Sequence, residues 1–233
     1  MNIAVFGTGM VAQTIGPAFA AQGHTVVYGT RNPAETLARS EAGPFGAPPF
    51  AEWFKTQPDA RLVPFAGAAE GAELIVNATS GQGSLPALES AGAQRLEGKI
   101  LIDIANPLDF SNGFPPSLSV CNTDSLGEQI QRAFPGLKVV KTLNTLTAAL
   151  MVNPAALPAD HVIFMSGDNA EAKTRVASLL QEAFGWKAQN IINLGDITTA
   201  RGTEMVLPLW VRLYASLQTP MFNFGIVRQS EAP

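Results

Sequence analysis

The sequence has few of the residues from which disulfides and metal sites are built. It has 233 residues with a single cysteine, Cys121, and only two histidines, His24 and His161. One thiol cannot form an internal disulfide, so the composition indicates a reducing compartment. Neither histidine has a cysteine or a carboxylate at metal-ligand spacing. We therefore expect a fold that depends on its own core and contains no metal site.

Charge and long apolar runs are also scarce. Charged residues make up 15% of the chain, the net charge is −4 and no basic block occurs, so nucleic acid is an unexpected partner. The most apolar late stretch, 205–217, contains Pro208 and Arg212 and is too short to cross a bilayer. Met1 leads into a strand-like run instead of the basic start of a signal peptide. These features predict a soluble cytoplasmic protein that makes no membrane contact.

What the sequence does have is apolar material, 46% of its residues, in alternating strand and helix patterns. In the first 150 residues, strands are predicted at 2–6, 24–29, 61–66, 71–79, 98–107 and 137–145, and helices at 10–23 and 126–134. The Pro- and Gly-rich segment 40–60 is either an elaborated loop or a short helix around Phe50–Lys55 flanked by turns. Nearly continuous apolar strands are typical of a parallel sheet covered on both faces. The pattern predicts an α/β protein, a Rossmann doubly wound parallel sheet spanning 1–150.

Residues 151–233 form a second predicted unit. Strands are expected at 161–167 and 190–195, and helices at 171–185 and 202–218, the last with a possible kink at Pro208. This mixture predicts a small C-terminal α+β domain.

The stretch GTGMVA, residues 7–12, has the G-x-G-x-x-A spacing of a dinucleotide-binding loop between a strand and a helix. Gly7 would allow the tight turn that leaves the strand, and Gly9 would let the backbone approach a pyrophosphate. Ala12 is small enough for close packing of the helix on the sheet. The positive end of that helix would then hold the phosphates. The alternative is an ordinary tight turn between a strand and a helix.

The end of the second predicted strand indicates which dinucleotide binds. An NAD site places Asp or Glu there, whereas this chain has GTRNP at 29–33. Thr30 offers a hydroxyl, Asn32 an amide, and Arg31 a planar cation that suits phosphate oxygens. The residues favour NADP(H), and the alternative for Arg31 is a solvated surface charge.

Two later strand ends supply further cofactor-binding candidates. Ligands of open parallel sheets bind at the carboxyl ends of the strands. The candidates for the nicotinamide half are Ala78, Thr79, Asn106 and Pro107. Gly81 and Gly83 either belong to this site or form a flexible turn. Asp103 lies inside an apolar strand and is expected to bond to neighbouring backbone.

The single cysteine and three aromatic residues are expected to have structural roles. Cys121 is expected to be a small buried hydrophobe. Trp186, Trp210 and Phe222 are expected to pack in the core, and stacking on a flavin-like ring is the alternative for these three. No G-x-S-x-G sequence occurs, so serine hydrolysis has no support. No acid–base pair is apparent, and no catalytic residue is predicted. Hydride transfer is consistent with that absence because it mainly needs two rings held face to face.

Several stretches together carry a resemblance to a known family. They are the GTGM loop (7–10), the TR pair (30–31), IANPLD (104–109), VKTLNTL (140–146), the SGD turn (166–168), and the late segments 203–218 and FNFGI (222–226). Over most of its length the chain resembles the deazaflavin-dependent NADP oxidoreductases, which move a hydride between NADP(H) and coenzyme F420. It is similar also to the cytoplasmic reductase domain of the STEAP metalloreductases.

The resemblance implies an NADP-dependent oxidoreductase that is a homodimer, with a C-terminal substrate and dimerisation domain at 151–233. It places Thr8, Gly9, Met10 and Val11 on the pyrophosphate. It also places Thr30 and Arg31 on the 2′-phosphate, Ala78 and Asn106 on the nicotinamide, and Asn144 where the second ring system meets the nicotinamide. The alternative for Asn144 is a turn residue at the end of a strand.

This chain departs from the archaeal deazaflavin reductases at two places. They have a histidine where this chain has Asn144, and a further basic residue where this chain has Pro33–Ala34–Glu35. The acceptor is therefore left open among a deazaflavin, a flavin such as FAD, ferric iron reduced through a flavin, or another small molecule. A non-catalytic NADP(H)-binding redox-sensor module is the alternative to an enzyme.

Overall fold

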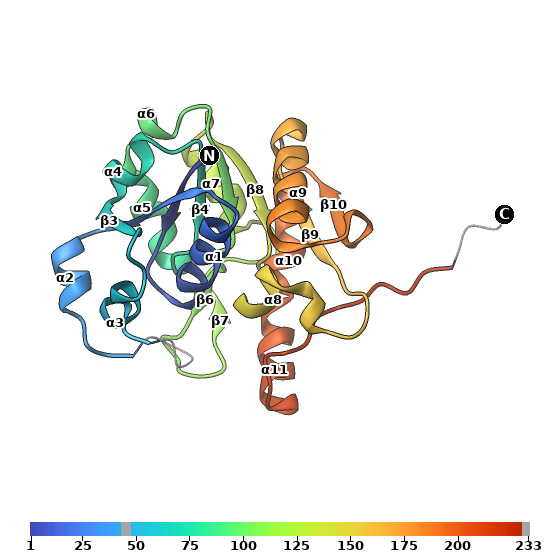
Figure 1. The fold of residues 1–233 in the computed structure, drawn as a ribbon. Coiled ribbons are helices and arrows are strands. Elements are labelled where there is room, and N and C mark those ends of the chain that lie inside the picture. Colours follow the sequence, from blue (N-terminus) through green and yellow to red (C-terminus); the bar gives the residue numbers. More distant parts are fainter. Residues whose placement is uncertain (43–47, 230–233) are drawn as a thin grey trace.

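The computed structural model describes residues 1–42 and 48–229 and shows helices packed on both faces of one sheet (Figure 1). Within these residues, eight strands form the sheet in the order β10-β9-β8-β5-β4-β1-β2-β3. The strands are β1 (Asn2–Phe6), β2 (Thr25–Thr30), β3 (Arg61–Pro64), β4 (Leu74–Asn77), β5 (Ile100–Asp103), β8 (Lys138–Thr142), β9 (Ile163–Ser166) and β10 (Ile191–Gly195). All neighbours pair in parallel except β8 and β9, which are antiparallel. The predicted Rossmann-like α/β fold is confirmed.

The helices divide between the two faces of the sheet. They are α1 (Met10–Ala21), α2 (Pro33–Ala38), α3 (Phe50–Lys55), α4 (Phe65–Glu70), α5 (Gly81–Ala91), α6 (Ala93–Leu96), α7 (Leu126–Ala133), α8 (Ala148–Val152), α9 (Ala170–Phe184), α10 (Ala200–Met205) and α11 (Leu207–Leu217). Short 3-10 turns occupy η2 (Pro154–Ala156), η3 (Ala188–Asn190) and η4 (Ile197–Thr199), and β6 (Leu108–Asp109) pairs with β7 (Ser117–Leu118) as a small hairpin.

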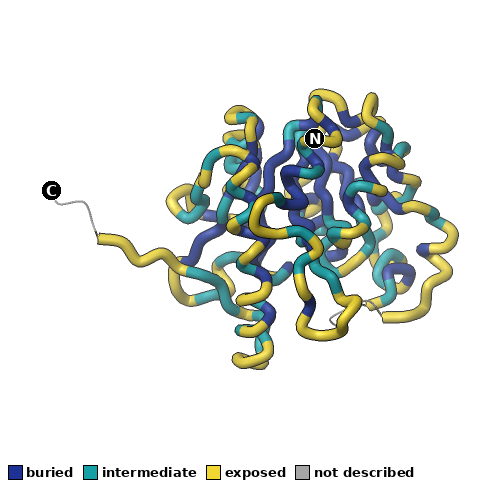
Figure 2. Tube along the Cα trace, turned by 180° about the vertical axis from the view of Figure 1, so that it is seen from behind, coloured by how far each residue is buried: buried dark blue, intermediate teal, exposed yellow. Residues whose placement is uncertain are grey.

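Side-chain alternation along the strands produces two cores. In β1, Ile3 and Val5 pack with α1, α3, α8 and α9, whereas Ala4 and Phe6 pack with α4, α5, α7 and α10. All four of these side chains are buried, because helices cover the sheet on both sides. Figure 2 shows the resulting buried interior surrounded by an exposed outer layer.

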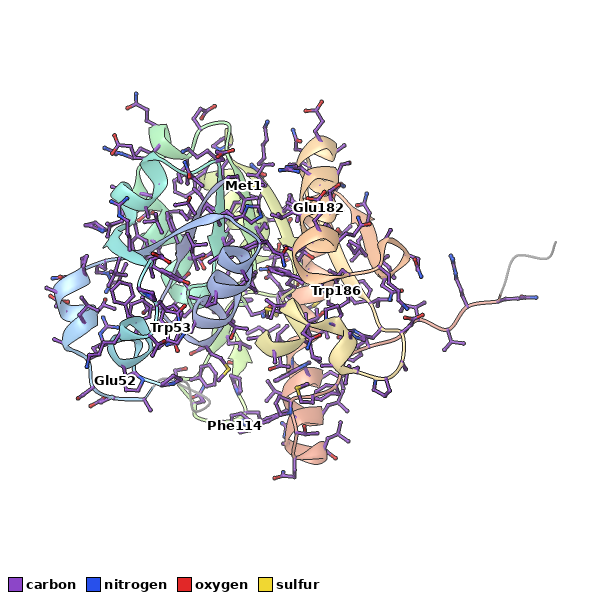
Figure 3. All side chains as sticks on the ribbon, in the orientation of Figure 1. Met1, Glu52, Trp53, Phe114, Glu182 and Trp186 are labelled. Atoms are coloured by element: carbon purple, nitrogen blue, oxygen red, sulfur yellow. The ribbon has the colours of Figure 1, made fainter. Side chains whose placement is uncertain are left out.

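The part of the chain after residue 150 extends the same sheet. Strand β9 pairs with β8, and β10 pairs with β9. Trp186 is buried in this part, as expected, and its indole N–H donates to the Met151 carbonyl at 2.8 Å (Figure 3). After α11, Asn223 donates to the Val162 carbonyl, and the exposed end of the chain then runs away from the body (Figure 1). The predicted division into two domains near residue 150 stays a prediction.

Several expected elements differ in extent. The strand predicted at 61–66 ends at Pro64, and α4 begins at the next residue, Phe65. The strand predicted at 71–79 spans only Leu74–Asn77. The helix predicted at 202–218 is divided at Val206 into α10 and α11. Pro208 lies in the first turn of α11, where its missing N–H costs nothing. In the segment 40–60, α3 matches the predicted short helix, while residues 43–47 lie outside the described residues.

Two side-chain predictions are wrong. Cys121 is exposed, because it lies in the irregular stretch between β7 and α7 and not in either core. Trp210 is only partly buried and stacks on Phe222 at 5.3 Å between ring centroids, so this pair lies outside the two cores. In the described residues, no helix is long and apolar enough to cross a membrane.

Candidate functional site

The loop between β1 and α1 has the geometry expected of a dinucleotide cradle. Gly7 has a φ of +119°, and a Cβ added there would lie 2.5 Å from the Ala78 carbonyl oxygen, so only glycine fits. Gly9 is the N-cap of α1, and a Cβ added there would meet nothing within 4 Å. Helix α1, which is twelve residues long, therefore starts without a capping side chain, and open space lies beside its first residue. Its first N–H groups are available for phosphate oxygens, which fits a bound pyrophosphate.

The three candidates after β2 are not equivalent. The Thr30 hydroxyl is buried and bonds to the Thr36 hydroxyl at 2.8 Å. The Asn32 carboxamide caps α2, accepting from the Ala34 and Glu35 N–H groups. Both side chains thus have structural roles, whereas Arg31 is exposed and bonds to no residue within 1–42 or 48–229. Arg31 is the one of the three with a cation available for a 2′-phosphate.

Thr79 and Asn77 form a polar cluster at the ends of β4 and β5. The Asn77 carboxamide oxygen accepts from the Thr79 hydroxyl at 2.7 Å, and its nitrogen donates to Ser84 Oγ and to Asp103 Oδ1. The Thr79 side chain is therefore held within the protein. Its neighbour Ala78 approaches the Gly7 turn.

Gly81 does not belong to a flexible turn, and neither does Gly83. Both lie in the first turn of α5, a helix that the sequence pattern did not reveal. A Cβ at Gly81 would lie 2.2 Å from the Asn106 carbonyl oxygen, so glycine lets α5 approach the loop after β5. Pro107 in the same loop is nearly covered, and its carbonyl accepts from the Ser119 N–H.

Asn106 and Asn144 bond to each other at the carboxyl ends of β5 and β8. Asn106 Nδ2 donates to the Asn144 backbone carbonyl at 2.8 Å, and Asn144 Nδ2 donates to Asn106 Oδ1 at 2.9 Å. Asn144 Nδ2 also donates to the backbone carbonyl of Thr203, in α10, at 3.2 Å. Because backbone carbonyls can only accept, these bonds define the orientation of both carboxamides. We call Asn106, Asn144 and the Thr203 carbonyl the amide layer.

A cavity of about 240 Å³ lies against the amide layer. Its lining includes Met10 and Val11 from the start of α1, together with Asn106 and Asn144. Residues 146–148 and Met151 also line it, as do four residues further along the chain: Leu207, Trp210, Tyr214 and Pro220. The cavity thus connects the start of α1 with helix α11 and the residues that follow it.

Trp210 gives the outer wall of this cavity an aromatic character. Its ring lies nearly parallel to Tyr214, with 7° between the planes and 5.8 Å between centroids, and it also stacks on Phe222. Its indole N–H is buried and has no partner in the described residues. An unpaired buried donor beside an apolar cavity suits a ligand that presents a hydrogen-bond acceptor.

A buried group of charges lies next to the amide layer. Lys141 is fully covered, and its Nζ lies 2.9 Å from Asp103 Oδ2 and 2.8 Å from Glu204 Oε1. It also donates to the Ala105 carbonyl. Burial lowers the pKa of Lys141, but the carboxylates of Asp103 and Glu204 outweigh that effect and raise the pKa above its ordinary value. Lys141 is therefore charged throughout the neutral range.

The sequence patterns did not reveal this ion-pair group. Asp103 does bond to nearby backbone, the Ala105 N–H, as expected, but it also pairs with a lysine from another strand. Lysine at an otherwise apolar strand position, in KVVKT, is the signal that could have revealed it. Glu204 was not identifiable, because its partners are about sixty to eighty residues away in the chain.

Fold and site together define a Rossmann-type dinucleotide-binding protein with a cavity at the carboxyl edge of its sheet. The family model for coenzyme F420-dependent NADP oxidoreductases matches residues 2–107. A crystal structure of a candidate F420-dependent NADP reductase from Arthrobacter sp. FB24 is 56% identical and covers 98% of this chain and all of that one, with a TM-score of 0.90. The chain belongs to the family of coenzyme F420-dependent NADP oxidoreductases, and it is an NADP-dependent oxidoreductase.

More distant relatives agree with the fold. The metalloreductase STEAP3 of Rattus norvegicus is 26% identical over 214 residues, which are 90% of this chain and 38% of that protein. The chain therefore spans little more than a third of this curated relative. An imine reductase from Myxococcus stipitatus in complex with NADP+ is 16% identical, with a TM-score of 0.57 over 94% of this chain and 64% of that one.

Proposed function

We propose that this protein binds NADPH along the carboxyl edge of the sheet and that a ring-shaped acceptor, a deazaflavin or a flavin, occupies the cavity. The observation that carries the proposal is the composition of the cavity. It joins the start of α1, the amide layer and an aromatic wall in one space. NADPH held there would supply the hydride that reduces the acceptor ring.

The residues of the N-terminal part would bind and orient the cofactor. The first N–H groups of α1, around Gly9, Met10 and Val11, would hold the pyrophosphate. Arg31 would pair with the 2′-phosphate. Ala78 and Asn106 would line the nicotinamide, and Thr8 and Pro107 would shape the loops without side-chain contacts of their own.

The residues of the C-terminal part would hold the acceptor and exclude water. Trp210 offers a flat surface for a ring and an unpaired N–H for a ring oxygen or nitrogen. The Asn144 carboxamide uses its nitrogen within the amide layer, which leaves its oxygen for a donor on the acceptor. No side chain has to exchange a proton in this scheme, because positioning two rings is the main requirement of hydride transfer.

We further propose that residues 151–233 act as a substrate and dimerisation domain of a homodimer. The cavity is smaller than typical small-molecule sites of about 300–1,000 Å³, so a second copy could complete it. Leu209 and Leu217 on α11 and Ile226 beyond it are more than half exposed. Light scattering tests this part, since a monomeric mass at all concentrations would contradict it.

The central experiment uses purified wild-type protein. Fluorescence titration compares the dissociation constants of NADPH and NADH, and oxidised deazaflavin, FAD or FMN is then added while the nicotinamide absorbance is followed. We expect tighter binding of NADPH and loss of the absorbance with one of these acceptors. Tight NADPH binding with no acceptor active would overturn the proposed hydride transfer and favour the redox-sensor alternative.

A further inference from the structure

Three segments that are distant in sequence contact one another in two separate groups of side chains near the cavity. The segments are the end of β5, the end of β8 and helix α10. The first meeting is the ion-pair group of Asp103, Lys141 and Glu204, which we call the charged layer. The second is the amide layer of Asn106, Asn144 and the Thr203 carbonyl. The cavity is lined by residues of the amide layer but by none of the charged layer.

The members of the two layers are close neighbours in sequence, so the positions of the two layers are coupled. Asn106 follows Asp103 by three residues, Asn144 follows Lys141 by three, and Thr203 directly precedes Glu204. Each layer therefore contains one member from each segment. A shift of α10 relative to β8 would change both layers together.

The charged layer is completed by three backbone N–H donors and by the Asn77 side chain. Glu204 Oε2 accepts from the Leu126 N–H at 2.8 Å, and Glu204 Oε1 accepts from the Gly127 N–H at 3.0 Å. These two groups are the first N–H donors of α7, where a carboxylate is favoured. Asp103 Oδ1 accepts from Asn77 Nδ2 and from the Ala105 N–H. Such pairing compensates the desolvation of three buried ions.

We propose that Glu204 and Lys141 are positioning residues for the pocket that would hold the nicotinamide and the acceptor. Glu204 anchors α10 to Lys141 and to α7, and the adjacent Thr203 carbonyl then fixes the Asn144 carboxamide, which bonds to Asn106. The inference rests on the proposed function, because it assigns the amide layer to that pocket. Neither residue touches the cavity, so both act through Asn144 and Asn106.

The decisive variant is Glu204→Gln, which keeps the shape of the side chain but removes its charge. The matched control is Arg201→Gln, one turn away on the same helix. Arg201 pairs with Glu128 across the same contact between α10 and α7, and it has no bond to either layer. Both variants should lower the melting temperature, whereas only Glu204→Gln should disturb the amide layer.

Two measurements distinguish an effect of Glu204 on the position of the bound rings from an effect on the stability of the protein. The dissociation constant of NADPH should stay within about threefold of wild type for both variants, because the glycine loop and Arg31 are unchanged. For Glu204→Gln alone, the fluorescence lifetime of bound NADPH should change, and kcat with the active acceptor should fall by about 10- to 100-fold. Equal behaviour of the two variants would overturn the proposal.

A double-mutant cycle with Asn144→Ala tests the route of the effect. If Glu204 acts through Asn144, the double variant should show about the same lifetime change as Asn144→Ala alone, and independent, additive changes would overturn the route. If Glu204→Gln does not fold, Asp103→Asn serves in its place, since it weakens the charged layer without touching α7.

The lifetime measurement requires no turnover. If wild type binds NADPH but reduces no acceptor, the proposed hydride transfer is wrong. The double-mutant cycle then still tests whether Glu204 acts as a positioning residue. Absence of NADPH binding by wild type would overturn both.

Discussion

The two ends of the proposed cofactor site are built in opposite ways. At the 2′-phosphate end, Arg31 is exposed and bonds to no other described residue, while its neighbours Thr30 and Asn32 serve the local backbone and α2. At the nicotinamide end, Asn106 and Asn144 are held by each other and by α10, with fully buried charges beside them. The first end depends on a single adaptable side chain, and the second on a rigid assembly.

An adaptable end suits the binding of a phosphate, and a rigid end suits hydride transfer. A phosphate needs charge, and an exposed arginine can adjust its long side chain to meet it. Hydride transfer needs ring placement to within about an ångström, which requires side chains that cannot rotate. We therefore expect variants at the rigid end to cost stability and turnover, and variants at the phosphate end to change cofactor choice.

The largest effect is expected from Lys141→Met, which leaves Asp103 and Glu204 as two buried carboxylates without their cation. The free energy of unfolding should fall by about 3–5 kcal/mol, measured by urea denaturation. Lys138→Met, at the half-buried first residue of the same strand, is the control and should cost far less. An equal loss for both variants would contradict the rigid-assembly view.

The pH dependence of this loss follows from the direction of the pKa shift. The pKa of Lys141 is raised in the folded protein, so its contribution to stability is fully present below the unfolded value of about 10.4. That contribution is lost only as the pH rises through the higher folded pKa. Wild type and Lys141→Met differ in their free energy of unfolding, and the part of this difference that comes from the lysine should therefore not fall between about pH 7 and pH 9.

Next in size is Gly7→Ala, between the two ends of the site. The added Cβ would combine a φ of +119° with a 2.5 Å approach to the Ala78 carbonyl oxygen. The strain should cost about 1–3 kcal/mol and weaken NADPH binding at least about tenfold. Gly23→Ala also carries a positive φ, but its Cβ meets nothing within 4 Å. This control should lose some stability yet bind NADPH normally in the same titration.

Arg31→Ala probes the adaptable end directly. Loss of a charge-assisted hydrogen bond should weaken NADPH binding by about 1.5–3 kcal/mol, or about 10- to 150-fold, and leave NADH binding unchanged. Melting temperature should not move, since Arg31 has no partner in the described part of the chain. Arg39→Ala, another exposed arginine just after α2, is the control. A parallel loss for NADPH and NADH would show that Arg31 does not recognise the 2′-phosphate.

The smallest effect is expected from Glu35→Gln. Glu35 Oε1 accepts from Asn32 Nδ2 at 2.8 Å, and its carboxylate stands four residues from Arg31. Removing this negative charge while keeping the hydrogen bond should tighten NADPH binding by about 0.3–1 kcal/mol at low salt. The gain should shrink as ionic strength rises, and Glu41→Gln should show no such gain. A gain that is independent of salt would point away from electrostatics.

Much of the fold was predictable because it depends on local patterns. Continuous apolar strands indicated a parallel sheet covered on both faces, and the glycine spacing located the turn into α1. The periodic helix expected at 171–185 is α9. The helices α4 and α5 were missed because α4 is only six residues long and α5 contains two glycines in its first turn and Pro86 in its interior. Cys121 was misplaced because burial is decided by neighbours from other segments.

The sequence by itself determined the Rossmann-like sheet, the glycine turn and the position of Arg31 after the second strand. The glycine turn and Arg31 lie within about thirty positions of each other, and each strand shows as its own apolar run, so local patterns reveal them. Only the tertiary structure decided that Lys141 meets Asp103 and Glu204, that Asn144 bonds to Asn106, and that Trp210 covers the same cavity. Those contacts join strands and helices far apart in the chain, and packing of the whole sheet brings them to one edge.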